Sequence, residues 1–139
     1  MPLLDLLLGL FVVLLLVLAN GFFVASEFSL VAIRRSRVEQ LEDEGHPLAR
    51  PLRQAIDHLD AYLATTQLGI TMASIGLGFV GEPALARVIE PLFVGLPPVT
   101  AAVSAHSIAL AVSFLLITAL HIVLGELAPK SLALQRSEQ

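Results

Sequence analysis

Residues 6–33 read LLLGLFVVLLLVLANGFFVASEFSLVAI, and this stretch decides the fold of the chain. Glu27 is its only charged residue. At about 1.5 Å of rise per residue, a helix over residues 3–33 is longer than the ~30 Å hydrocarbon core of a bilayer. We therefore predict a first membrane span at residues 3–33, which must tilt, kink near Asn20-Gly21, or protrude from the membrane.

A cleaved signal peptide is the alternative explanation for an apolar segment near the N-terminus. The basic flank of such a peptide is missing, because Asp5 is the only charged residue before Glu27. No small-residue cleavage site follows the apolar core before apolar sequence resumes. The segment is therefore interpreted as a span that stays in the protein.

Two further stretches of the chain lack charge, one between Asp60 and Glu82 and one between Glu90 and Glu126. Each is long enough to cross a bilayer. Both contain many Thr, Ser, Gly and Ala residues, which allow helices to approach closely and to form hydrogen bonds with one another. The second and third spans are therefore placed at residues 61–81 and 99–124.

The composition of the whole chain agrees with three spans. Of its 139 residues 56% are hydrophobic and 14% are charged, against roughly a quarter charged in soluble proteins. The mean hydropathy is +0.84. The absence of cysteine excludes disulfides and cysteine–zinc sites, and a net charge of −4 without a basic tract excludes a nucleic-acid partner. We predict an all-α membrane protein with three transmembrane helices in a lipid bilayer.

The orientation in the membrane follows from the distribution of Lys and Arg. Five arginines lie between the first two spans, and two basic residues follow the third span. The segment 82–98 between the second and third spans contains a single basic residue, Arg87. We predict a multi-pass protein of the cell inner (plasma) membrane, with the N-terminus outside and the tail 126–139 in the cytoplasm.

The segment between the first two spans has a helical pattern of its own. Apolar residues recur at helix-like intervals through residues 36–58, and Glu44-Gly45-His46-Pro47 interrupts the pattern. We predict a cytoplasmic juxtamembrane hairpin of two short helices lying along the membrane surface or beneath the spans. A solvated connector is the alternative.

Polar side chains inside the predicted spans are the candidates for function, because acids at membrane depth are costly. Asn20 and Glu27 lie nearly two helical turns apart and face the same way, with Ser26 to one side. Glu126 stands at the foot of the third span, shortly before Pro129, which frees carbonyl groups one turn earlier. Such oxygen ligands suit a hard cation such as Mg²⁺. Hydrogen bonds between helices are the alternative role for Asn20, Ser26 and Glu27.

The remaining polar residues of the spans have simpler explanations. Hydroxyls of the second span, including Ser74, commonly bond to carbonyls of their own helix. His106 and His121 lie fifteen residues apart in the third span, and polar packing explains them better than a metal pair without neighbouring ligands. No catalytic constellation is present in the sequence, so we predict that the protein is not an enzyme.

Residues 20–27 read NGFFVASE, residues 65–71 read TTQLGIT and residues 125–131 read GELAPKS. Together these three motifs resemble the transmembrane part of the CorC/CorB/CNNM family of magnesium exporters. Residues 20–27 resemble the family signature of the first span. Residues 65–71 are similar to the T-x-Q-x-G segment of the second span. Residues 125–131 resemble the G-E-x-x-P-K-[ST] motif.

The resemblance implies a homodimer with a Mg²⁺ site in each protomer and with export coupled to Na⁺ entry. It carries Ser26 and Glu126 over as ligands most clearly. Other positions implied for the site are Asn20, Gly125, Ser74 in the second span, and the backbone carbonyls of Phe22 and Phe23. Family members normally continue into CBS nucleotide-binding modules, which are absent from these 139 residues, so we expect the chain to be the transmembrane domain alone.

Two functions remain open at the level of sequence. The leading hypothesis is a Mg²⁺ exporter that works by alternating access, with Co²⁺ and Mn²⁺ as further candidate cargo. The alternative is a membrane scaffold or sensor module that anchors cytoplasmic regulatory domains. An acid that faces the bundle interior favours the exporter, because a scaffold has no need of Glu126 at that depth. The small residues Gly69, Ala73 and Gly76 share one helical face and offer a seam for packing or for dimerisation.

Overall fold

The architecture is that of a computed structural model, which describes residues 2–93 and 105–136. Within these residues the chain is helical and contains no strand, which confirms the all-α prediction. The elements in chain order are α1 (Pro2–Ala32), α2 (Arg35–Asp43), α3 (Ala49–Asp57), α4 (Leu59–Phe93), α5 (Ala105–Leu120), the π-helix η1 (His121–Leu127) and α6 (Ala128–Gln135).

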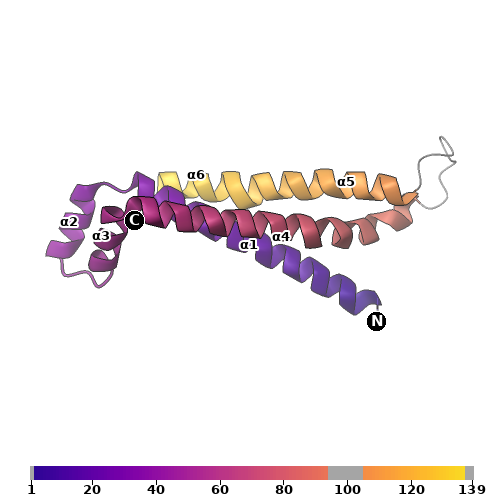
Figure 1. Cartoon of the computed structure of the whole chain (residues 1–139), viewed down its shortest axis with the longest axis horizontal. Coiled ribbons are helices and arrows are strands. Elements are labelled where there is room, and N and C mark those ends of the chain that lie inside the picture. The colour runs from indigo at the N-terminus through magenta and orange to yellow at the C-terminus, as the bar shows by residue number, and fades with distance from the viewer. Residues whose placement is uncertain (1, 94–104, 137–139) are drawn as a thin grey trace.

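Three long helical segments form the body of the molecule (Figure 1). Those long and apolar enough to cross a membrane are Leu3–Ala32, Leu59–Leu92 and His106–Gln135. The last is continuous through α5, η1 and α6. In Figure 1 the short helices α2 and α3 lie beyond one end of the bundle, and the N-terminal end of α1 lies apart from α5 at the other end. The N-terminal half of α1 still packs against α4, because a Cβ atom on Gly9 would lie 3.1 Å from the Cβ atom of Ala84.

The outer surface of the long segments is covered with large apolar side chains. Phe79 is 85% exposed and Phe11 is 57% exposed, and leucines occupy most of the remaining outer positions of α1. A water-soluble monomer rarely exposes a continuous apolar surface of this extent. The protein is therefore a multi-pass membrane protein whose apolar outer surface faces lipid.

The helices differ in extent from the predicted spans. Helix α1 runs from Pro2 to Ala32, so its helical winding is not interrupted at Asn20-Gly21, where the sequence allowed a kink as one of three alternatives. Helix α4 continues to Phe93 through Pro83 and Pro91, and so takes up much of the predicted connection 82–98. Prolines are tolerated in membrane helices because neighbouring groups satisfy the backbone atoms that they free.

The C-terminal part of the chain also departs from the predicted bounds. The third segment stays helical beyond residue 124 and ends at Gln135, inside the predicted tail. The predicted residues 94–98 of the connection, 99–104 of the third span and 137–139 of the tail lie outside the described residues.

The two short helices follow the predicted hairpin pattern. Helices α2 and α3 are separated at residues 44–48, where Gly45 adopts a φ of +71° that side chains disfavour. The guanidinium group of Arg53 on α3 lies 3.6 Å from Glu39, 3.8 Å from Glu42 and 3.4 Å from Asp57. The predicted interruption between two helices is therefore confirmed.

The predicted seam of small residues on the second span packs against α1 within the same chain. A Cβ atom on Gly69 would lie 2.6 Å from the ring of Phe23, and one on Gly76 would lie 3.2 Å from Leu16. Ala73, between them, is buried. The seam is therefore occupied inside one protomer, and a homodimer would have to use other faces.

Substitution of Gly69 by alanine is expected to destabilise the bundle by about 1–3 kcal/mol, because the bulky ring of Phe23 must move to admit a methyl group. The matched control is Gly78→Ala on the same helix, where nothing lies within 4 Å of the added atom. Thermal unfolding of both variants in one detergent measures the difference. Equal stability of the two variants would show that α1 and α4 do not pack as described.

A candidate cation site between the three long helices

A polar cluster joins the three long segments at the level of Asn20. The Asn20 side chain is only 1% exposed, and its Nδ2 donates to the carbonyl oxygen of Gly125 over 2.8 Å. The same Nδ2 lies 3.1 Å from Nε2 of His121, which in turn lies 3.3 Å from Oγ of Ser74. We call Asn20, Ser74, His121 and Gly125 the three-helix polar cluster.

The local sequence around Pro129 explains why the Gly125 carbonyl is available to a side chain. Proline has no backbone N–H, so a regular α-helix would leave the carbonyl four residues earlier, at Gly125, without its donor. The preceding residues 121–127 wind as a π-helix, a form found mostly as short segments at functional sites. The amide of Asn20 supplies a donor to Gly125 from the neighbouring helix.

Glycine at two positions allows these helices to approach. A Cβ atom on Gly125 would lie 3.0 Å from Nδ2 of Asn20 and 3.2 Å from the ring of His121. A Cβ atom on Gly21 would lie 3.1 Å from the ring of Pro129. The contact of α1 with η1 and α6 therefore depends on the absence of side chains at residues 21 and 125.

The amide nitrogen of Asn20 and the hydroxyl of Ser74 both have acceptors, whereas one acceptor of the cluster has no donor. The amide group of Asn20 has two hydrogens, and it faces two acceptors, on Gly125 and His121. The hydroxyl of Ser74 donates to the carbonyl of Ile70 over 2.8 Å. Oδ1 of Asn20 is buried and has no hydrogen-bond partner among the residues that the structure describes, which costs about 1–3 kcal/mol. An unpaired acceptor in such a place is suited to a cation or a water molecule.

The structure brings together three of the seven residues that the sequence proposed for the site, namely Asn20, Ser74 and Gly125. Ser26 instead donates to the carbonyl of Phe22 over 2.7 Å within α1, and the side chain of Phe22 is 66% exposed. Glu126 follows Gly125 directly, but its side chain is exposed in the single chain. The roles of Ser26, Phe22 and Glu126 in a site remain predictions.

The hydroxyls of the second span behave as expected. Thr65, Thr66, Thr71 and Ser74 each donate to a carbonyl of their own helix. His106 pairs with Glu90 at 3.3 Å, at the far end of α5 from His121. Within residues 2–93 and 105–136 no group of three His, Cys, Asp or Glu side chains could hold a metal, so most ligands of a cation here would be hydroxyl, amide and backbone oxygens.

The sequence analysis missed His121 as a member of the cluster. One signal was present in the sequence, because His121 lies four residues before Gly125 and so shares its helical face. What could not be derived is that this face meets Asn20 of α1 and Ser74 of α4. His121 takes part in polar packing as predicted, but at the centre of the candidate site.

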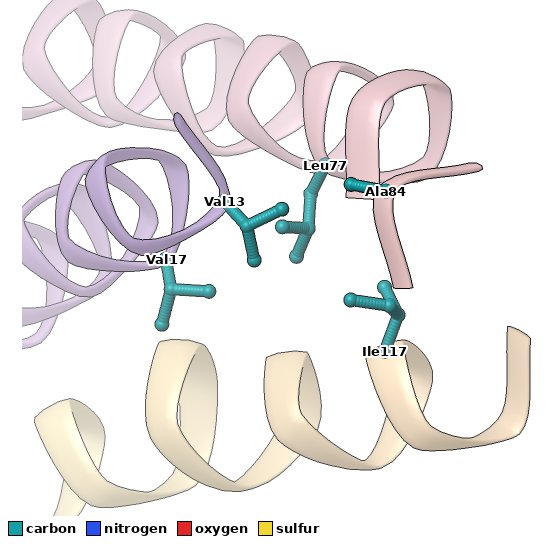
Figure 2. Packing of buried hydrophobic residues seen from close by; sticks show 5 residues of the cluster. All are labelled: Val13, Val17, Leu77, Ala84 and Ile117. Atoms are coloured by element: carbon teal, nitrogen blue, oxygen red, sulfur yellow. The ribbon is translucent and has the colours of Figure 1, made fainter. Parts of the chain in front are cut away.

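An apolar cluster closes the bundle on the side of the α1 N-terminus. Val13, Val17, Leu77, Ala84 and Ile117 are buried together, and Figure 2 shows their side chains pointing toward one another from three helices. On each helix these residues lie about one to three turns from the polar cluster, with Val17 three residues from Asn20 and Leu77 three residues from Ser74. The cluster therefore separates the polar centre from that end of the molecule.

Comparison with known proteins identifies the family. The profile of the Cyclin M transmembrane N-terminal domain, CNNM, matches residues 10–139. The chain belongs to the CNNM family. The match covers all three long segments and the polar cluster, and the resemblance inferred from the three sequence motifs is thereby confirmed.

Bacterial relatives of this CNNM domain are similar along nearly the whole chain. UPF0053 protein YhdT of Bacillus subtilis is 51% identical over 126 residues, 89% of this chain and 26% of that protein. UPF0053 protein YhdP of the same organism is 45% identical over 130 residues, 94% of this chain and 29% of that protein. Uncharacterized protein Rv1841c of Mycobacterium tuberculosis is 40% identical over 137 residues, 97% of this chain and 37% of that protein.

The CNNM chain thus spans 26–37% of the length of these curated relatives. It is the membrane domain of a family that is associated with divalent cation transport.

Proposed function

We propose that this CNNM domain exports Mg²⁺ by alternating access to a site centred on Asn20. The observation that carries the proposal is the buried, unpartnered Oδ1 of Asn20 at the meeting point of three helices. A polar acceptor in that place has no structural use in a scaffold, whereas a transported cation would satisfy it.

The chemistry of the surrounding atoms fits Mg²⁺. This ion takes about six oxygen ligands and usually keeps some of its water. Oδ1 of Asn20 and Oγ of Ser74 are neutral oxygens from two helices, and Glu126 would add a carboxylate from the third. Ser26 and the carbonyl of Phe22 lie on α1 toward its C-terminal end and would complete the ligand set. Because the Glu126 side chain is exposed, η1 has to rearrange to bring it to the site.

Alternating access requires a barrier on one side of the site at a time. The apolar cluster of Figure 2 would be the barrier on the side of the α1 N-terminus, because apolar constrictions exclude hydrated ions. With the N-terminus outside, this arrangement corresponds to a site that is closed to the exterior. Coupling to Na⁺ entry and assembly as a homodimer belong to the same proposal, as does residence in the plasma membrane.

The orientation can be tested directly, because the chain contains no cysteine of its own. A cysteine in place of Glu90 is expected to react with a membrane-impermeant thiol reagent added to intact cells. A cysteine in place of Gln40 on α2 is expected to react only after the cells are opened. The expectation follows from the excess of basic residues on the α2–α3 side, and the reverse labelling pattern would refute it.

Binding and transport decide between an exporter and a scaffold. Mg²⁺ is expected to raise the melting temperature of the purified chain, because a ligand that binds only the folded state stabilises it. Proteoliposomes with the chain are also expected to move Mg²⁺. A scaffold or sensor anchor would show neither effect, and that result would refute the exporter.

A further inference from the structure

We propose that His121 is the positioning residue of the cation site, because it holds the amide of Asn20 in the orientation that leaves Oδ1 free for the cation. The inference rests on the proposed function, since it requires Asn20 to be a ligand. It assigns His121 a role through Asn20, with no contact between the imidazole and the cation.

The contacts of Asn20 determine which way its amide points. The amide atom that lies 2.8 Å from the carbonyl oxygen of Gly125 must be the nitrogen, since an oxygen there would place two acceptors against each other. The same atom lies 3.1 Å from Nε2 of His121. The nitrogen therefore has an acceptor for each of its two hydrogens, and Oδ1 is the atom left over.

The inference requires one tautomer of His121. Nε2 can accept from Asn20 only through a lone pair, so the proton of the ring must then lie on Nδ1. Ser74 does not compete for that lone pair, because its hydroxyl donates to Ile70 over 2.8 Å. The contact of Ser74 with Nε2, at 3.3 Å, is longer.

The amide of Asn20 has less freedom to rotate with two acceptors beside its nitrogen than with a single acceptor. With the Gly125 carbonyl alone, the amide of Asn20 can rotate while keeping one hydrogen bond, and its second N–H is left buried without a partner. Any rotation that turns an N–H toward the site presents a positive group to the cation. His121 removes that freedom by accepting the second hydrogen. Outer partners of this kind typically change metal affinity 10–100-fold when they are lost.

The test compares three replacements of His121 in the full chain, with Mg²⁺ titrated against the melting temperature. His121→Phe keeps a ring but has no acceptor. His121→Gln can place an amide oxygen about where Nε2 lies, whereas His121→Asn reaches only about as far as Nδ1. We expect His121→Phe and His121→Asn to weaken the apparent Mg²⁺ affinity about 10–100-fold, and His121→Gln to retain most of it. His106→Phe on α5 is the matched control and is expected to leave the affinity unchanged.

Each outcome bears on a different claim. If His121→Phe lowers the melting temperature without Mg²⁺ but binds Mg²⁺ as tightly as the unmodified chain does, the role of His121 is structural and this inference is wrong. If His121→Gln and His121→Asn bind Mg²⁺ equally, the position of the acceptor is irrelevant and the inference is also wrong. This comparison holds even if His121→Phe fails to fold. If the unmodified chain itself shows no Mg²⁺-dependent shift, the proposed function fails and this inference with it.

Discussion

Replacement of Glu126 by alanine is expected to abolish both Mg²⁺ binding and export. The other proposed ligands are neutral, so Glu126 supplies the only formal charge opposite a divalent ion in a low-dielectric site. A buried charge that loses its partner is strongly destabilised, and we expect no Mg²⁺-dependent rise in melting temperature and no flux into proteoliposomes. Glu126→Gln keeps the shape and one oxygen but loses the charge, and it should fail in the same way.

The control for this experiment is Glu90→Gln, at the opposite end of the bundle. Glu90 contacts His106 and lies on α4 four turns beyond Ser74, so its charge is remote from the proposed site. Mg²⁺ binding by this variant is expected to equal that of the unmodified chain. Normal binding and export by Glu126→Ala would refute the assignment of Glu126 as a ligand.

Substitution of Leu77 by alanine is expected to open the apolar barrier. Leu77 is 1% exposed and lies at the centre of the cluster in Figure 2, so the truncated side chain leaves a cavity between three helices. Such a cavity costs about 2–5 kcal/mol, measured as a loss of unfolding free energy. It also admits water to a constriction that excludes ions by being dry, and we expect Mg²⁺ to leak through the variant down its gradient.

Ile75→Ala is the matched control for the barrier, because Ile75 is on the same helix and is 65% exposed. Its unfolding free energy is expected to change by no more than about 0.5 kcal/mol, as for other outward-facing substitutions. A Mg²⁺-sensitive dye inside proteoliposomes measures the leak for both variants. A tight Leu77→Ala variant would show that the apolar cluster is not the barrier.

The number of long helices was predictable because the hydrocarbon core requires a minimum length of apolar sequence, and three stretches of the chain reach that length. The ends of the helices were not predictable, because a helix can continue beyond the hydrocarbon core of the membrane. Charged residues such as Glu82 and Arg87 were taken as a loop, but they lie on the continuation of α4. Irregular backbone was expected both at Asn20-Gly21 and one turn before Pro129; α1 is continuous at the first place, and the π-helix η1 lies at the second.

The site was partly predictable for a similar reason. Asn20 was identified because an amide inside an apolar span is conspicuous in the sequence, whereas Gly125 was implied by the resemblance of residues 125–131 to a family motif. His121 was not identified, because its role depends on which faces of three helices meet. A histidine among leucines has the same local sequence whether it faces lipid, a carbonyl or an amide, and only the contacts with Asn20 and Ser74 distinguish these cases.

The π-type winding of η1 has a mechanical consequence for the end of the chain. In a helix, one residue more or less in a turn changes the angular phase of everything after it by about 100°. Any exchange between π and α winding within residues 121–127 would therefore rotate α6 about its own axis. Lys130, whose ammonium group lies 4.4 Å above the ring of Phe28, would swing away from that ring. A change of winding at Gly125 would in this way rotate α6 as far as Gln135, some 15 Å along the helix axis.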